Sequence, residues 1–191
     1  MLLSLDGLSV GDCLGERFFG ETEAAVERIR SREIPGPVWR YTDDTEMALN
    51  VVETLLAHER IDQDDLARRF ATRFTFDRGY GRSTYEILSG IREGHSWRWL
   101  SQSAFRGRGS FGNGSAMRAG PIGAYYSDDL GRVAREAALS AEVTHAHEEG
   151  IAGATAVAVA AALAWRCREA SPEPREFLQQ VCELVPPGYT R

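Results

Sequence analysis

Apolar residues recur every three or four positions along most of this chain, which is the spacing of helices with one buried face. The clearest run starts at Met47 and predicts a helix that ends between His58 and Ile61. No segment alternates apolar and polar residues for long enough to predict a strand. The pattern therefore predicts an all-α fold, whose further helices we expect at 62–74, 85–94, 128–144, 148–168 and 171–185.

Helical periodicity is lost over 97–123, which is rich in glycine. A segment this irregular within a compact domain is usually functional or disordered, and its apolar side chains favour an ordered, functional loop. Its centre, from Gly109 to Arg118, reads GSFGNGSAMR, so backbone N–H groups are open to a phosphate or sugar. Arg118 is expected to pair with a pyrophosphate. The alternative is a long connection, which leaves unexplained why Asn113 and Ser115 are interleaved with glycine.

Composition narrows the function classes. The 191 residues suffice for one domain, which we assign to 1–191. All 22 basic residues are arginine, which excludes mechanisms that need a lysine, and the net charge of -6 argues against a nucleic-acid partner. The N-terminus lacks the basic region of a signal peptide, and the longest uncharged run, Gly150 to Trp165, is shorter than a bilayer span. We expect a cytoplasmic protein with no membrane partner.

Two adjacent carboxylates, Asp43 and Asp44, lie between Thr42 and Thr45 just before the first long apolar run. One interpretation is a helix cap, because Asp43 and Glu46 have the spacing of a capping box. The other is part of a metal site, since such oxygen ligands suit magnesium, calcium or manganese, and capping needs only one acid. The spacing alone leaves both open.

Gly7, Gly11 and Gly15 fall four residues apart and form a bare stripe if this segment is helical. The stripe is expected either to pack closely against a neighbouring helix or to face a substrate, with Asp12 beside it.

The two histidines of the segment THAHEEG, His145 and His147, are two residues apart and cannot share one helix face. One is expected to point inward and the other to solvent. Neither their spacing nor a third ligand supports a zinc site.

Four ordered motifs resemble those of the ADP-ribosylglycohydrolase family, which includes the dinitrogenase reductase-activating glycohydrolase. They read GLSVGDCLGERF from Gly7, YTDDTEMAL from Tyr41, GSFGNGSAMRAGPIG from Gly109 and TH at Thr144, before an alanine-rich helix. The likeness runs from Gly7 to about Trp165. It implies an orthogonal helical bundle that removes ADP-ribose from modified protein side chains or related ADP-ribosyl compounds, using a pair of Mg²⁺ or Mn²⁺ ions.

The resemblance also implies roles for single residues. Thr42, Asp43 and Asp44 would ligate the metal, and both aspartates would belong to the catalytic centre. Cleavage at the ribose passes through an oxocarbenium-like state, which carboxylates and a polarised water stabilise. The substrate contacts implied for the pyrophosphate, the ribose and the rest of ADP-ribose come from Ser110, Phe111, Gly112, Asn113 and His145.

The sequence departs from the family pattern in two places. Members often carry a glutamate four residues after the last glycine of the first motif, where this chain has Phe19. The nearest acids are Glu16, Glu21 and Glu23, of which Glu16 is our candidate for the catalytic acid. Members also carry a second acidic motif, Asp-Xaa-Asp-Thr, which nothing after Trp165 matches. We therefore expect half of a dinuclear site in a domain that is short at its C-terminal end.

Three interpretations stay open from the sequence. The first is a metal-dependent ADP-ribosylglycohydrolase, whose acceptor is an arginine, a serine or a small molecule. The second is a non-catalytic ADP-ribose-binding or structural relative that lacks the second half of the metal site. The third is a helical domain whose motifs serve only caps and packing.

Overall fold

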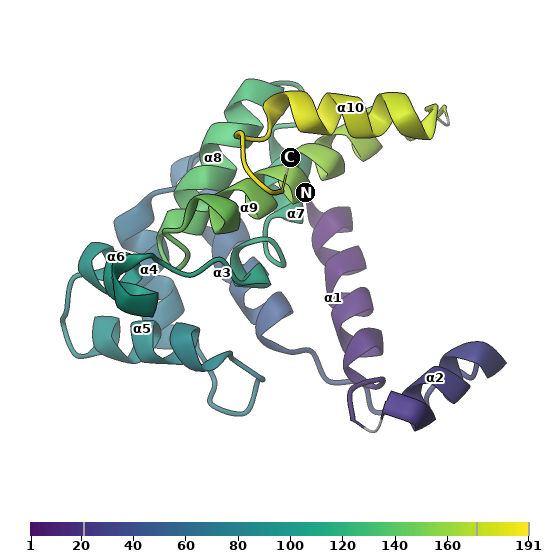
Figure 1. The fold of residues 1–191 in the computed structure, drawn as a ribbon, viewed down its shortest axis with the longest axis horizontal. Helices are drawn as coiled ribbons and strands as arrows, with labels where there is room; N and C mark the ends of the chain where they lie inside the picture. Colours follow the sequence, from purple (N-terminus) through teal and green to yellow (C-terminus); the bar gives the residue numbers. More distant parts are fainter. Residues whose placement is uncertain (21, 171, 191) are drawn as a thin grey trace.

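The computed structural model describes residues 1–20, 22–170 and 172–190, and within them it contains helices and no strand (Figure 1). The all-α prediction is confirmed, and the predicted helices that start near Met47 and at 62–74 end within a residue or so of their expected positions. In chain order the elements are α1 (Leu2–Glu16), α2 (Thr22–Ser31), α3 (Asp43–His58), α4 (Gln63–Arg73), α5 (Arg82–Arg92), α6 (Trp97–Gly107), the 3-10 turn η1 (Asn113–Ser115), α7 (Gly120–Tyr125), α8 (Leu130–Glu142), α9 (Glu148–Arg166) and α10 (Pro174–Leu184).

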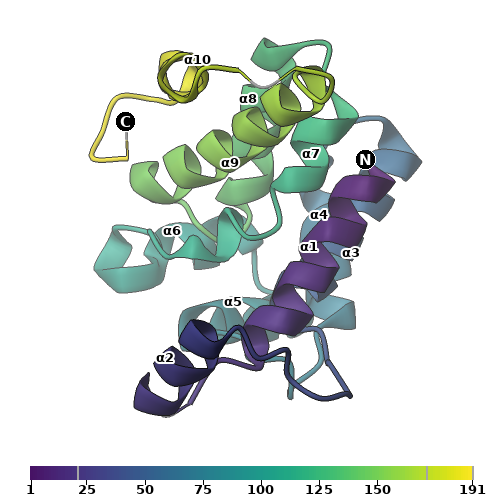
Figure 2. The ribbon, with the colours of Figure 1, turned by 90° about the vertical axis from the view of Figure 1, so that its right-hand side faces the viewer.

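Helix α9 lies at the centre of the bundle, between α7, α8 and α10 (Figures 1 and 2). Its alanine-rich face is fully buried at Ala154, Ala158 and Ala162, and this lets α7 approach very closely. A Cβ atom at Gly123 of α7 would lie only 1.9 Å from the backbone oxygen of Ala158. By length and composition α9 is apolar enough to cross a membrane, as core helices of folded proteins often are. Its buried alanine face makes it a core helix here.

The segment 97–123 is more regular than its sequence predicts. It contains α6, η1 and α7. In α6, Trp97 and Ser101 are buried, whereas Trp99, which breaks the apolar period, stays 63% exposed. Helical geometry is lost only near the end of α6, where Phe105 and Arg106 have φ of 52° and 63°. The irregular backbone therefore starts at Ala104, within the last turn of α6, and continues into the loop that follows.

Helix α2 is absent from the sequence-based prediction, and its packing explains why. Ala25 is its one described residue that is buried, so the segment has almost no apolar face to recognise. In Figure 1 it projects from the foot of α1, away from the rest of the bundle.

Helix α1 runs along the outside of the bundle and packs against α3 and α7 (Figure 2). Cβ atoms added at Gly7, Gly11 or Gly15 would meet nothing within 4 Å. The close helix packing considered for this glycine stripe is therefore not found in the described part of the chain. The stripe lies open instead.

Candidate functional site

The acidic motif lies at the N-terminus of α3, but its cap differs from the predicted one. Thr42 is the N-cap residue, and its hydroxyl accepts a hydrogen bond from the Asp44 backbone N–H at 3.4 Å. The prediction of a capping box between Asp43 and Glu46 is wrong, because the Glu46 side chain points to the loop that follows α4. Its carboxylate accepts hydrogen bonds from the backbone N–H of Thr75 at 2.7 Å, the Thr75 hydroxyl at 2.6 Å and the Tyr80 hydroxyl at 2.9 Å.

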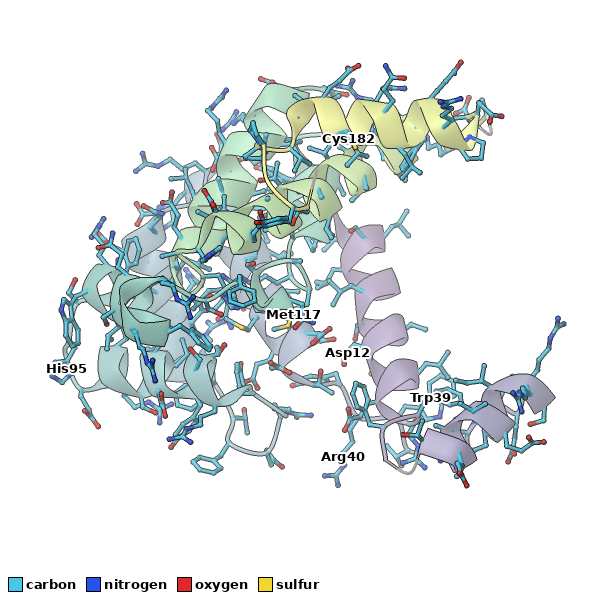
Figure 3. The ribbon with its side chains drawn as sticks, in the orientation of Figure 1. Asp12, Trp39, Arg40, His95, Met117 and Cys182 are labelled. Carbon is cyan, nitrogen blue, oxygen red and sulfur yellow. The ribbon has the colours of Figure 1, made fainter. Side chains whose placement is uncertain are left out.

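A second carboxylate, Asp12 of α1, does most of the capping. It accepts hydrogen bonds from the backbone N–H and hydroxyl of Thr42 at 2.8 and 2.6 Å. It also accepts from the backbone N–H and hydroxyl of Thr45 at 3.2 and 2.6 Å. Figure 3 labels Asp12 on the helix beside the acidic motif. Asp43 and Asp44 therefore do not supply the N-cap, although both lie in the first turn of α3, where a helix favours negative charge, and Asp44 Oδ1 lies 3.4 Å from the Thr42 hydroxyl.

The charge of this acidic group is not balanced by the protein. In the described part of the chain neither Asp12, Asp43 nor Asp44 forms an ion pair. Burial, then the neighbouring charges of Asp44 and Asp12, raises the pKa of Asp43 to about 6. Burial and the charge of Asp12 also raise the pKa of Asp44. A site that raises carboxylate pKa values in this way favours a bound cation.

The oxygen ligands of this motif suit a hard divalent cation, but they would fill only part of its coordination sphere. Thr42, Asp43 and Asp44 are the ligand types that magnesium and manganese prefer. Among the described residues, no group of three or more histidine, cysteine, aspartate or glutamate side chains is placed to hold a metal ion. The described residues therefore show no complete metal site, and the metal role of this motif stays a prediction.

One cleft of about 470 Å³ brings most of the predicted site together. Its walls also include residues that the sequence did not single out, namely Gly79, Gly81–Thr84, Phe105, Gly114 and Met117. Gly79 and Gly81, in the segment FDRGYGRST, were the available sequence signal for that wall. The predicted residues that line the cleft are Asp43, Asp44, Ser110, Gly112, Asn113 and His145.

Four predicted residues are not among those that line this cleft, namely Glu16, Thr42, Phe111 and Arg118. Thr42 and Glu16 line a neighbouring cleft of about 540 Å³ with Trp39 and Arg40, and the two clefts share Gly79. Figure 3 shows Trp39 and Arg40 near the foot of α1. Of the acids near the Phe19 position, Glu16 and Glu23 are exposed, whereas Glu21 lies outside the described residues.

Phe111 does not line the cleft itself, but it is 60% exposed and its ring centroid lies 6.4 Å from that of Phe105, which does. Phe105 is 50% exposed and reaches this place with the positive φ of its backbone. Two large aromatic rings that are half exposed at a cleft are available to stack on a planar ligand.

The glycine-rich loop requires glycine at particular positions. Gly109 has φ of +72°, and a Cβ there would lie 2.6 Å from the backbone nitrogen of His147. At Gly114 a Cβ would lie 2.8 Å from Cε1 of His145. Directly after Gly114, the Ser115 hydroxyl donates to the backbone oxygen of Gly150 at 2.8 Å. These contacts explain the interleaved glycines, because the loop is packed directly on the histidine segment.

Arg118 does not occupy the position expected for a pyrophosphate ligand. Its side chain is fully buried, 0% exposed, and its guanidinium lies 4.6 Å from the ring centroid of Phe70. It donates hydrogen bonds to the backbone oxygen of Gly114 at 3.0 Å and to that of Ser140 at 2.7 Å. The sequence could not distinguish a basic residue beneath the loop from one facing the ligand.

The two histidines divide as their spacing predicts. His145 is 3% exposed at the base of the cleft, where burial and then the charge of Arg118 lower its pKa to about 3. His147 lies nearer the surface, and its Nδ1 caps α9 by accepting from the backbone N–H of Glu149 at 3.1 Å.

Comparison with known proteins identifies the family of this chain. The sequence model of the ADP-ribosylglycohydrolase family matches residues 2–189, so this chain belongs to that family. It is 36% identical to ADP-ribosylhydrolase ARH3 of Gallus gallus over 84% of this chain and 48% of that protein. It is 34% identical to ADP-ribosylhydrolase ARH3 of Homo sapiens, covering 93% of this chain and 52% of that protein. A protein of Archaeoglobus fulgidus is also 34% identical over 94% of this chain and 59% of its own length. The chain thus spans about half the length of the curated relatives it matches.

Proposed function

We propose that this chain forms the ADP-ribose cleft and one half of the metal site of a metal-dependent ADP-ribosylglycohydrolase. Its substrates would be ADP-ribosylated protein side chains or small ADP-ribosyl compounds. The observation that supports this best is the single cleft shared by two aspartates of unbalanced charge and a glycine-rich loop. Exposed backbone suits a pyrophosphate, and carboxylates suit the oxocarbenium-like state of ribosyl cleavage.

Different residues of the cleft would contact different parts of the ligand. The loop around Gly112 and the Asn113 amide would hold the pyrophosphate and ribose, with Ser110 beside them. Phe105 and Phe111 would stack on the adenine. This leaves the anomeric carbon at the acidic end of the cleft.

At that end, Asp43 and Asp44 would serve as metal ligands and stabilise positive charge on the ribose. A bound Mg²⁺ or Mn²⁺ supplies Lewis acidity toward the ribose and the attacking water. An aspartate that ligates metal is a poor free base, so the base would be another acid. Glu16 is the candidate, since it lines the adjoining cleft beside Thr42.

The second candidate is an ADP-ribose-binding protein without catalysis. One observation favours it, namely that the described residues contain no complete group of metal-ligating side chains. A cleft with an intact nucleotide end and half of a metal site would still bind ADP-ribose.

The decisive experiment follows ADP-ribose release from ADP-ribosyl-arginine and from an ADP-ribosyl-serine peptide with Mg²⁺, beside calorimetric binding of ADP-ribose. Release that a chelator stops supports the hydrolase. Binding with no release from either substrate supports the second candidate. If the protein neither binds ADP-ribose nor releases it, both candidates are rejected.

The matched variants are Asp44→Asn and Asp128→Asn. Both remove one carboxylate from a pair of adjacent aspartates, but Asp128 is exposed and lies outside the residues that line the cleft. Release should fall at least about 100-fold for Asp44→Asn, as for loss of a transition-state contact, and stay unchanged for Asp128→Asn.

A further inference from the structure

Behind the glycine-rich loop, three buried side chains form a chain of hydrogen bonds that ends in the cleft. It begins at Arg118, whose Nη2 donates to the backbone oxygen of Ser140 at 2.7 Å and to Oγ1 of Thr144 at 3.0 Å. A guanidinium has donors only, so the Thr144 oxygen must act as the acceptor in this contact. Both hydrogens of Nη2 are then used.

The hydroxyl proton of Thr144 has one destination. Its Oγ1 lies 2.7 Å from Nδ1 of His145, and Thr144 is 0% exposed. No other acceptor for this proton is found in the described residues. A buried hydroxyl proton left without an acceptor is costly, so the proton points to Nδ1.

The protonation of His145 follows from this contact. Nδ1 is an acceptor, so it carries no proton, and a neutral ring must then carry its single proton on Nε2. The charge of Arg118 and the burial of the ring both oppose an imidazolium, in agreement with the lowered pKa of His145.

The Nε2 edge of the ring points to the ligand side. His145 lines the cleft, and within the described part of the chain no hydrogen bond is found for Nε2. Cβ atoms added at Gly112 and Gly114 would lie 3.6 and 3.0 Å from Nε2, so this nitrogen lies directly beneath the loop. Side chains on these glycines would cover it or push it aside.

We propose that Arg118 and Thr144 are positioning residues that fix His145 as an Nε2–H donor, so that the cleft gives a hydrogen bond to an acceptor oxygen of the ligand. The oxygen would belong to a phosphate or a ribose hydroxyl, and a group that can only donate would be rejected. The tautomer follows from the hydrogen bonds alone. The contact with the ligand rests on the proposed function.

The test is nitrogen NMR of the imidazoles in the full chain labelled with ¹⁵N-histidine, in which a His145→Gln variant assigns one of the four histidines. Wild type at neutral pH should show a protonated Nε2 and an unprotonated Nδ1 for His145. Thr144→Val should give a mixture of tautomers, and Thr144→Ser should restore the wild-type signals. The control is Thr155→Val, since Thr155 is equally buried but donates to the backbone oxygen of Ile151.

Adding ADP-ribose tests the contact. The Nε2 signal of His145 should shift, and Thr144→Val should bind ADP-ribose about fivefold to tenfold more weakly, as for one misplaced hydrogen bond. A protonated Nδ1 in wild type, or wild-type tautomers in Thr144→Val, would overturn the relay. ADP-ribose binding that leaves both Nε2 and the Thr144→Val affinity unchanged would overturn the contact. Wild type that binds no ADP-ribose would reject the contact and the proposed function together, while the tautomer signals still decide the relay.

Discussion

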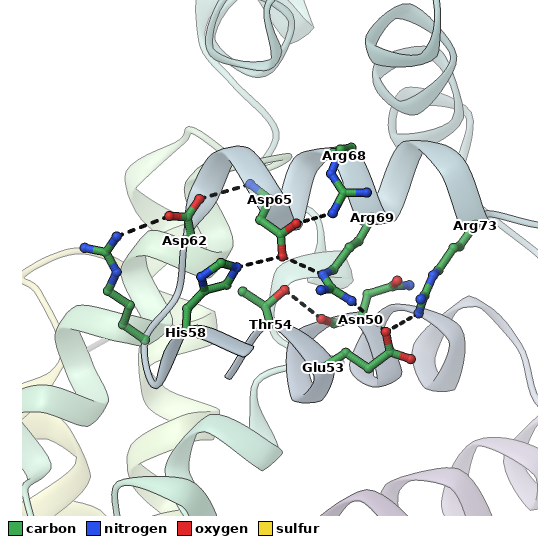
Figure 4. Close-up of polar contacts among 10 residues, drawn as sticks. Asn50, Glu53, Thr54, His58, Asp62, Asp65, Arg68, Arg69 and Arg73 are labelled. Atoms are coloured by element: carbon green, nitrogen blue, oxygen red, sulfur yellow. Dashed lines mark hydrogen bonds and ion pairs between the residues drawn. The ribbon is translucent and has the colours of Figure 1, made fainter. Parts of the chain in front are cut away.

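Acidic clusters of opposite character lie near the two ends of helix α3. At its start, Asp43 and Asp44 have no cationic partner among the described residues, and the pKa of Asp43 is raised to about 6. Near its end, Asp65 of α4 accepts hydrogen bonds from Arg69 at 2.6 Å, from Arg68 and, at 3.1 Å, from the His58 ring (Figure 4). Although burial alone would raise it, these contacts lower the pKa of Asp65 to about 2.

This difference separates acids that hold the fold together from acids that we propose to hold a ligand. Glu53 extends the ion-pair network around Asp65, because it pairs with Arg69 at 2.7 Å and with Arg73. That network is complete without any added ion. Among the described residues, the carboxylates at the start of α3 have no cationic partner in the folded state. A protein tolerates such a site where a bound cation or substrate supplies the positive charge.

The largest effect should come from removing a ligand at the start of α3. Asp44→Asn should weaken Mn²⁺ binding, followed by electron paramagnetic resonance, by at least about 100-fold, because a charged oxygen ligand is lost. Asp65→Asn should leave the affinity unchanged. Equal affinities in the two variants, or no Mn²⁺ binding by wild type, would contradict a metal role for the acidic motif.

Stability should respond in the other cluster. Asp65→Asn should lower the free energy of unfolding at neutral pH by about 1–2 kcal/mol, because Arg69 and Arg68 lose their carboxylate. The pKa of Asp65 is depressed in the folded state, so its contribution is present above about pH 4 and fades as pH falls toward 2. Urea titrations at several pH values measure this, with Asp128→Asn as the control. A constant difference at all pH values would show that the charge is not responsible.

The opposite sign is expected at Asp43. Its folded pKa is raised, so protonation favours the folded state, and the ionised group costs stability as pH rises from about 4 through 6. After allowance for solvent screening, Asp43→Asn should raise the free energy of unfolding by about 1 kcal/mol near pH 7.5 in the absence of divalent ions. The gain should vanish near pH 4, where wild-type Asp43 is also neutral. A loss of stability at neutral pH would mean that Asp43 has a structural partner.

The smallest effect should come from the edge of the balanced cluster. The Glu53 side chain is 40% exposed, so Glu53→Gln should cost only about 0.5 kcal/mol. Thermal unfolding at low and high salt measures it, and salt should shrink the difference. A cost as large as that of Asp65→Asn would show that the two acids act as one unit.

Much of the fold follows from the local pattern of the sequence. The positions of α3, α4, α8 and α9 were predicted, because their apolar residues and their ends can be recognised in the sequence. Helix α2 has almost no buried face, and in α6 the exposed Trp99 hides the period.

The site divides in the same way. Motif order indicated Asp43, Asp44, Asn113 and His145, which do line one cleft. The inward turn of Arg118 and the role of Glu46 as an acceptor for the next loop depend on partners far along the chain. No spacing in the sequence encodes such contacts.

The position of Asp12 ties the first motif to the second. Its two oxygens take four donors from Thr42 and Thr45, 30 and 33 residues further along the chain. Replacing Asp12 alone would leave two hydroxyl groups and two backbone N–H groups without this acceptor. Chains that diverge at this position should therefore change all three sites in concert, and the three form one unit of covariation rather than parts of two independent motifs.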